Sequence, residues 1–325
     1  MATITQQLSI PGKPEHLRPF DSQRDLRNVA DLVELCFSDT IDVDGRRYLQ
    51  QMRFAADNPR YMRWAAAAIE ISSLPSAGYV WEENGKLVGN LSLIPFSVQS
   101  ARYYLIANVA VHPDYRKHGI ARMLTASGIE HARKRGAKAT WLHVREENEA
   151  ATNLYRSLGF KERARRTSWH SHAAPPSQPV DPGIRFRPRR HQDWGAQKAW
   201  LVTTYPPELT WHMPLKLADL RPGLAGALYR FFTQLHIRQW SALQNGDLLG
   251  ILSKVASTGH ADHLWLAAWP ENEDLAAAAL LSHARQHFGL RRTLSLDYPA
   301  GRAVEAIQSA GFDAHQTLIW MEDRF

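Results

Sequence analysis

The sequence repeats itself once, and this duplication limits the available folds more than any other feature. The matched segments are residues 17–19 with 186–188, 84–89 with 245–250, and 159–160 with 311–312. The chain has 325 residues, which is enough for two domains of ordinary size that each bury a core. The duplication therefore predicts two tandem domains of one fold.

Hydrophobic periodicity and turn residues place the expected boundaries. Residues 171–183 contain four prolines and few large apolar side chains, as is typical of a linker. We expect a flexible arm at 1–15, a first domain at 16–170, this linker at 171–183 and a second domain at 184–325. In the first domain, strands are expected at 16–20, 78–82, 86–94, 98–104, 105–111, 140–144 and 161–170, and the first helices at 25–37 and 39–71.

The stretch 105–160 carries most of the chemical information. An apolar strand (105–111) leads into a basic loop (116–121), which opens an amphipathic helix. The start of a helix presents unpaired backbone N–H groups and the positive end of the helix dipole. Small residues at Gly119 and Ala121 leave room for a bulky anion to approach the backbone. The pattern predicts a phosphate-binding turn.

This stretch resembles the central motif of the GNAT superfamily of acyl-CoA-dependent N-acetyltransferases, which reads R/Q-x-x-G-x-G/A after a strand. Here the motif positions are Arg116, Gly119 and Ala121. The family's second motif is similar to a set formed by Asn148, Ala151, Tyr155, Gly159 and Phe160. The resemblance covers nearly the full chain. It implies an α/β fold with mixed sheets: two tandem GNAT-like domains, each a twisted, mostly antiparallel sheet with helices on both faces.

The resemblance also implies an activity, the transfer of an acetyl group from acetyl-CoA to a primary amine by direct attack in the N-terminal domain. In the family, a bulge in the central strand, here 108–111, frees backbone N–H groups for the pantetheine and the thioester oxygen. The implied contacts with acetyl-CoA come from Asn108, Val109, Ala110, Val111, Arg116, Lys117, His118, Gly119, Ile120, Ala121, Arg122, Asn148, Ala151 and Tyr155. No metal is expected.

Individual roles follow from the same motifs. Tyr155 is the expected general acid, because a phenol with a pKa of ~10 can share a proton with a departing thiolate of pKa ~8.5. The alternative for Tyr155 is core packing. Asn148 would bind the pantetheine arm, cap a helix, or do both. The general base stays open among Glu82, His143, Glu146 and Glu147, and the acceptor contacts among Asp42, Asp44, Tyr61 and Trp64.

The second copy is expected to have lost the cofactor site. Pro113 matches Pro270, 157 residues later, whereas Gly136 matches Gly289, only 153 residues later. The second copy therefore lacks four residues in the interval that holds the loop of the first copy. The remaining segment, 270–275, carries three carboxylates that would repel a pyrophosphate. Ala306 or Ile307 stands in place of the motif tyrosine.

Composition narrows the remaining alternatives. The net charge of +7 favours anionic partners without choosing among them. The single cysteine, Cys36, cannot form an internal disulfide, which fits a reducing compartment. No apolar run approaches the ~20 residues of a bilayer span, and no secretory signal is visible. We therefore expect a cytoplasmic protein. The histidine-containing segments 170–172 and 260–263 have metal-like spacing but lack the further ligands of a site.

Two other interpretations stay open. A non-catalytic sensor or scaffold would bind acyl-CoA without turnover. A nucleic-acid-binding protein would lose affinity steeply with salt, but no recognised motif supports this interpretation, and neither nucleic acid nor membrane is an expected partner. The acceptor, the acyl-chain preference and the oligomeric state are not specified by the sequence.

Overall fold

The computed structural model describes residues 14–58, 74–75, 77–171, 181–206, 209, 217–223, 235–257, 259–288 and 292–325. The chain divides into two compact units, Met1–Arg163 with Trp320–Phe325, and Ala164–Ile319. Most of the expected arm, most of the expected linker, and the acceptor candidates Tyr61 and Trp64 lie outside the described residues.

The first unit is a mixed sheet with strand order β1-β2-β3-β4-β5-β12. Its strands are β1 (Leu17–Pro19), β2 (Ala77–Glu83), β3 (Lys86–Val98), β4 (Ala101–Val111), β5 (Ala139–Arg145) and the end of β12 (Phe312–Arg324). Its helices are α1 (Ser22–Phe37), α2 (Val43–Asp57), α4 (Ile120–Lys134) and α5 (Glu149–Ser157). The pairs β1–β2, β2–β3 and β3–β4 are antiparallel, whereas β4 and β5 are parallel.

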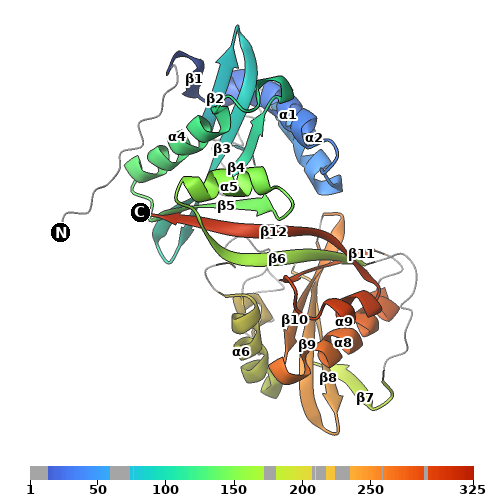
Figure 1. Cartoon of the computed structure of the whole chain (residues 1–325). Helices are drawn as coiled ribbons and strands as arrows, with labels where there is room; N and C mark the ends of the chain where they lie inside the picture. Colours follow the sequence, from blue (N-terminus) through green and yellow to red (C-terminus); the bar gives the residue numbers. More distant parts are fainter. Residues whose placement is uncertain are drawn as a thin grey trace, which may run out of the picture. The chain divides into compact units, whose positions relative to one another are not determined.

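Helices cover both faces of this sheet (Figure 1). On one face, Leu26 of α1 and Met52 of α2 join Val80 of β2 in an apolar cluster. On the other face α4 packs tightly, since a Cβ added to Gly89 of β3 would lie 2.9 Å from the Ile120 side chain. The α/β fold expected for this half is confirmed.

One hairpin of the first unit differs from expectation. The expected strands 98–104 and 105–111 form a single strand, β4, and Val98 ends β3 instead. The turn between β3 and β4 consists of Gln99 and Ser100, both with left-handed backbone (φ 48° and 66°). Two-residue turns with positive φ at both positions favour Asn, Asp and Gly, so the Gln-Ser pair does not mark this turn in the sequence.

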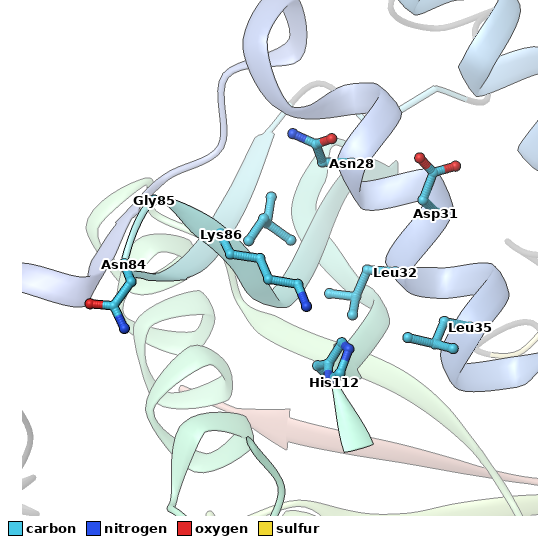
Figure 2. Close-up of a pocket in the computed structure, with 9 residues that line it drawn as sticks. Asn28, Asp31, Leu32, Leu35, Asn84, Gly85, Lys86 and His112 are labelled. Atoms are coloured by element: carbon cyan, nitrogen blue, oxygen red, sulfur yellow. The ribbon is translucent and has the colours of Figure 1, made fainter. Parts of the chain in front are cut away.

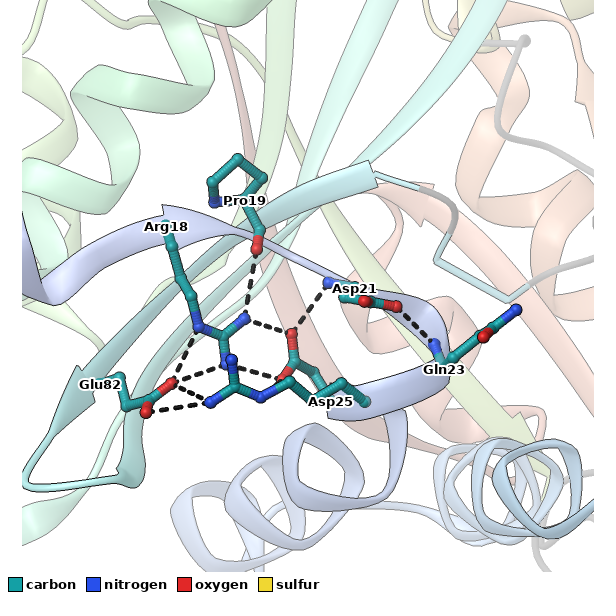
Figure 3. Close-up of polar contacts among 7 residues, drawn as sticks. Arg18, Pro19, Asp21, Gln23, Asp25 and Glu82 are labelled. Carbon is teal, nitrogen blue, oxygen red and sulfur yellow. Dashed lines mark hydrogen bonds and ion pairs between the residues drawn. The ribbon is translucent and has the colours of Figure 1, made fainter.

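An ion-pair cluster fastens β1 to α1 and β2 (Figure 3). Both amino groups of Arg18 donate to the carboxylate of Asp25, at 2.6 and 2.8 Å, and its Nε donates to Glu82 at 2.8 Å. Asp25 is 1% exposed and also accepts from the backbone N–H of Asp21. Burial alone would raise the pKa of Asp25, but these hydrogen bonds and the charge of Arg18 outweigh it and lower the pKa.

Replacing Arg18 with methionine is expected to reduce the free energy of unfolding by about 3 kcal/mol, because Asp25 would remain buried without its counter-charge. Urea titration measures the loss. The control is Arg24→Met, since Arg24 is 57% exposed and its contact with Glu82 lies at the surface; we expect a loss below about 1 kcal/mol there. Equal losses in the two variants would contradict this account of the cluster.

The second unit has the same architecture. Its strand order is β12-β6-β11-β10-β9-β8-β7. Its strands are the first part of β12, β6 (Lys161–Ser171), β7 (Ile184–Pro188), β8 (Ile237–Gln244), β9 (Asp247–Val255), β10 (Ala261–Ala268) and β11 (Thr293–Pro299). Strand β6 belongs to this unit from Ala164 onward. Its described helices include α6 (Trp194–Thr204), α8 (Glu273–Phe288) and α9 (Val304–Ser309).

Details of the first unit recur at the matching positions of the second. Arg187 of β7 binds Asp193 through both amino groups, at 2.6 and 2.8 Å, as Arg18 binds Asp25. The hairpin turn at Asn245 and Gly246 has positive φ at both residues, like its counterpart at 84–85. The duplication seen in the sequence is therefore present in the backbone and in the buried ion pairs.

The pH dependence of stability offers a test of the second ion pair. Burial would raise the pKa of Asp193, but hydrogen bonds from Arg187, the Arg190 N–H and Ser241 hold it at about 2. The stabilisation from this depressed pKa is complete above the pKa of the unfolded carboxyl, ~3.9, and is lost as the pH falls through about 2. We expect the stability difference between wild type and Asp193→Asn to shrink by about 2 kcal/mol from about pH 6 to pH 2. A pH-independent difference in urea titrations would show that Asp193 is not held ionised by these contacts.

The limits of the compact units differ from the expected domain limits. The expected first domain ran from 16 to 170 and the second from 184 to the C-terminus. Instead, β6 joins the second unit from Ala164, and Trp320–Phe325 belong to the first. Trp169 of β6 is buried in the core of the second unit, and the Trp320 ring lies 4.1 Å from that of His143 on β5. An alternating strand pattern does not specify which sheet a strand joins, so the sequence could not show this exchange.

Candidate active site

A bulge interrupts the central strand β4 of the first unit. Asn90 of β3 pairs with Ala110 of β4, and Ser92 of β3 pairs with Ala107 of β4. Between these two pairs β3 has one residue and β4 has two, so β4 contains one extra residue. Asn108 lies in this bulge and has a left-handed backbone conformation, with φ 51°. The parallel pairing of β4 with β5 runs from Tyr103 to Ile106 of β4 and extends no further along the described strands. Beyond Ile106, the β5-facing edge of β4 offers backbone N–H groups to a ligand.

The basic loop leads from this edge to the start of α4. The Nε of Arg116 donates to the carbonyl of Val111 at 3.2 Å, which holds the loop against the end of β4. Lys117 and Gly119 both have positive φ, 66° and 78°. Gly119 is the N-cap of α4, and a Cβ built on it meets no atom within 4 Å. The first N–H groups of α4 and the positive end of its dipole lie at this glycine.

Helix α5 supplies the residues of the second motif. Asn148 is its N-cap and accepts from the N–H of Ala151 at 3.1 Å, so the capping role is present. Arg122, on the first turn of α4, donates to Ser157 at 2.7 Å and ties the two helices together.

Tyr155 of α5 is 7% exposed, and its ring lies edge-on to Phe160 at 5.9 Å. Burial raises the pKa of Tyr155 to about 12. The phenol is therefore protonated throughout the physiological range, as a proton donor must be.

The residues considered as general base do not converge in the structure. Glu82 belongs to the ion-pair cluster, where the hydrogen bond from Arg18 lowers its pKa and weakens it as a base. His143 of β5 packs against the ring of Trp320, which is on β12. Glu147 is exposed and lies 3.5 Å from Arg145, and Glu146 is also exposed.

Two of the acceptor candidates have structural roles. Asp42 caps α2 by accepting from the N–H of Gly45 at 2.7 Å. Asp44 pairs with Arg47 at 2.9 Å on the exposed face of the same helix.

A polar cluster at the bulge was missed by the sequence analysis. The side-chain amide of Asn108 lies 3.4 Å from the hydroxyls of both Tyr48 and Ser92, and that of Asn90 donates to the carbonyl of Asn108 at 2.9 Å. Burial raises the pKa of Tyr48, so this hydroxyl also stays protonated. The sequence does contain a signal for Asn90, because the matching position of the second copy holds the apolar residue Ile251.

A surface hollow of the first unit lies apart from these groups (Figure 2). Asn28 and Asp31 of α1 form one wall, and Lys86 of the β2–β3 hairpin and His112 form the other. Its described lining does not include the bulge, the loop or Tyr155. This hollow is thus not where the motif residues gather.

The second unit differs at each matching position. Strand β10 pairs with β9 in regular register, with Ile251 opposite Ala267 and Ser253 opposite Trp265. At the start of α8, the carboxylate of Glu273 accepts from Arg302 at 2.7 Å and from the hydroxyl of Tyr298. Fully buried Ile307 replaces the motif tyrosine, with Gly311 and Phe312 matching 159–160.

Two negative observations apply to the described part of the chain. No three histidine, cysteine, aspartate or glutamate side chains there are grouped in a way that could hold a metal ion. No described helix has both the length and the apolar character needed to cross a bilayer.

The bulge, the loop and the two motif helices coincide with a match to a known family. Residues 43–160 match the profile of the acetyltransferase (GNAT) family. These residues of the first unit thus match a GNAT acetyltransferase domain. Among curated relatives, the [ribosomal protein bS18]-alanine N-acetyltransferase of Escherichia coli K12 is 44% identical over 63 residues, which are 19% of this chain and 43% of that protein. The mycothiol acetyltransferase of Thermobifida fusca is 49% identical over 53 residues, 16% of each chain. The chain thus spans less than half the length of these relatives.

A solved structure extends the likeness to both units. A GCN5-related N-acetyltransferase from Sphaerobacter thermophilus aligns with a TM-score of 0.59 at 15% identity, over 96% of this chain and 97% of that one. At this identity the likeness concerns the fold alone. Both units of the chain therefore have the GNAT fold in tandem, as expected.

Proposed function

We propose that the first GNAT unit transfers an acetyl group from acetyl-CoA to a primary amine. The observation that carries the proposal is the bulge at Asn108, where β4 separates from β5; the chain continues from there through the basic loop to the N-terminus of α4 at Ile120. A thioester at the bulge and a pyrophosphate at Gly119 would each meet unpaired N–H groups. The expected contacts at 108–111 and 116–122 agree with this placement of acetyl-CoA.

The reaction requires three events at the bulge. The neutral amine attacks the thioester carbonyl carbon, and the negative oxygen that forms is stabilised by the backbone N–H groups of β4. The carbon–sulfur bond then breaks, and Tyr155, as the general acid, passes its proton to the departing CoA sulfur. The amine loses a proton to solvent, and solvent returns a proton to Tyr155, so the products are an amide and the CoA thiol.

Asn148 complements this arrangement. Its side-chain oxygen is engaged in capping α5, which leaves its amide NH₂ as a donor for a carbonyl of the pantetheine arm. The two roles foreseen for Asn148, capping and cofactor contact, are compatible in one rotamer.

The second unit is proposed to be a degenerate copy without a cofactor site. Its regular β10 offers no bulge, and Glu273 places a carboxylate at the start of α8, where a phosphate would have to bind. The net positive charge of the chain, +7, is then explained by surface residues and the cofactor loop rather than by nucleic acid. We place the reaction in the cytoplasm, in keeping with a single cysteine.

The test is CoA release, followed with a thiol reagent, in the presence of acetyl-CoA and a panel of amines. The first probe is a tripeptide with a free N-terminal alanine, because relatives act on an alanine of a ribosomal protein. Lysine with a blocked α-amine and spermidine are the next probes. Amine-dependent release supports the proposal. Binding of acetyl-CoA without release for any amine would favour a sensor instead.

A further inference from the structure

Asn90 is a polar residue in an apolar setting on β3. It is 0% exposed and pairs with Ala110, beside the apolar cluster formed by α1, α2, Val80 and Ala110. Its Nδ2 donates to the Asn108 carbonyl at 2.9 Å, while its Oδ1 has no donor within the described part of the chain. A buried amide oxygen without a donor costs free energy. The bond to Asn108 must therefore serve a purpose that an apolar residue would not.

The second unit shows which residue occupies the position of Asn90 when the neighbouring strand has no bulge. Ile251 occupies the matching place, is equally buried, and faces a β10 that lacks the extra residue. The amide and the bulge are thus present together in the first unit and absent together in the second. This correlation links the Asn90 side chain to the bulge rather than to packing.

Peptide geometry indicates the purpose. A trans peptide is planar, so the carbonyl of Asn108 and the N–H of Val109 point in opposite directions. By holding the carbonyl on the β3 side, Asn90 turns the Val109 N–H away from β3, and β5 lies on the opposite side of β4. That is the side on which β4 and β5 separate.

We infer that Asn90 is a positioning residue that locks the bulge so that the Val109 N–H faces the thioester oxygen. The inference rests on the proposed acetyl transfer. Asn90 itself does not touch the substrate. Its amide replaces the ladder hydrogen bond that the bulge breaks, and it fixes the direction of a backbone donor on which the oxyanion depends.

The test compares Asn90→Leu, which keeps the number and branching of the side-chain heavy atoms but removes the donor, with Val88→Ala. Val88 is equally buried on the same strand, so its truncation lowers stability without touching the bulge. Two experiments are made at 25 °C: steady-state CoA release from acetyl-CoA with the alanine tripeptide, which gives kcat and KM, and hydrogen exchange of the peptide covering 105–111 in the free protein.

For Asn90→Leu we expect kcat to fall about 100-fold, as for the loss of one oxyanion donor, with the KM for acetyl-CoA within about threefold of wild type. Amide exchange at 107–110 should rise at least tenfold, and Val88→Ala should change neither quantity more than about twofold. Equal kcat and exchange in wild type and Asn90→Leu, or equal losses in both variants, would overturn the inference. If the wild type releases no CoA, the proposed function fails, while exchange in the free protein still decides whether Asn90 locks the bulge.

Discussion

Gly119→Glu is expected to weaken the binding of acetyl-CoA at least 100-fold, or about 2.7 kcal/mol. Gly119 caps α4 with φ 78°, and the space above its Cα is open. A glutamate there would carry its own carboxylate to the N–H groups that we assign to the pyrophosphate. Since acidic residues stabilise a helix N-terminus, α4 should survive, and the loss should lie in binding alone. Calorimetric titration with acetyl-CoA measures it.

The matched control for this variant is Gly136→Glu. Gly136 follows the other end of α4, has φ 70°, and likewise has no atom within 4 Å of a built Cβ. The substitution imposes the same backbone strain and the same charge far from the proposed phosphate site. Its affinity for acetyl-CoA should stay within about twofold of wild type. If Gly119→Glu also binds within threefold of wild type, the loop assignment is wrong.

Tyr155→Phe should leave the affinity for acetyl-CoA within twofold and reduce kcat about 100-fold, as expected for removal of a general acid. The ring is buried against Phe160, and phenylalanine keeps that packing while it removes the hydroxyl. Burial raises the pKa of Tyr155 to about 12, so its protonation should not limit the wild-type rate below about pH 11. Steady-state CoA release across pH 6–10 tests both statements.

Tyr104→Phe is the control for the loss of a buried tyrosine hydroxyl. Tyr104 is 5% exposed on β4, and its ring lies 5.7 Å from that of His131 on α4, outside the bulge at 107–110. Its kcat should match that of wild type. A Tyr155→Phe variant with unchanged kcat would reduce Tyr155 to a core residue, the alternative that its burial also fits.

The parts of the fold that the sequence predicted are those with local signals. Asn84 and Gly85 marked a hairpin because both have the positive φ that these residues tolerate. The loop before α4 was recognised from Gly119 and its basic neighbours, and Asn148 was recognised as a cap because it precedes a helical pattern. In each case, one or two residues determine the backbone around them.

The features that the sequence did not predict depend on contacts between distant segments. The exchange of β6 and the end of β12 is set by where Trp169 and Trp320 are buried, which a strand pattern does not encode. The polar cluster at the bulge joins Tyr48 of α2 to Asn90 of β3 and Asn108 of β4. No pattern within a single segment shows that these three residues meet, because the pairing register and the packing of α2 bring them together.

We expect one unit of the tandem pair to bind acetyl-CoA and the other not to bind it. A calorimetric titration of the full chain with acetyl-CoA distinguishes these cases, because it returns stoichiometry as well as affinity. We expect one equivalent per chain for wild type and at least 100-fold weaker binding for Gly119→Glu. Two equivalents would contradict the loss of the site in the second unit, and no binding at all would contradict the assignment of the first.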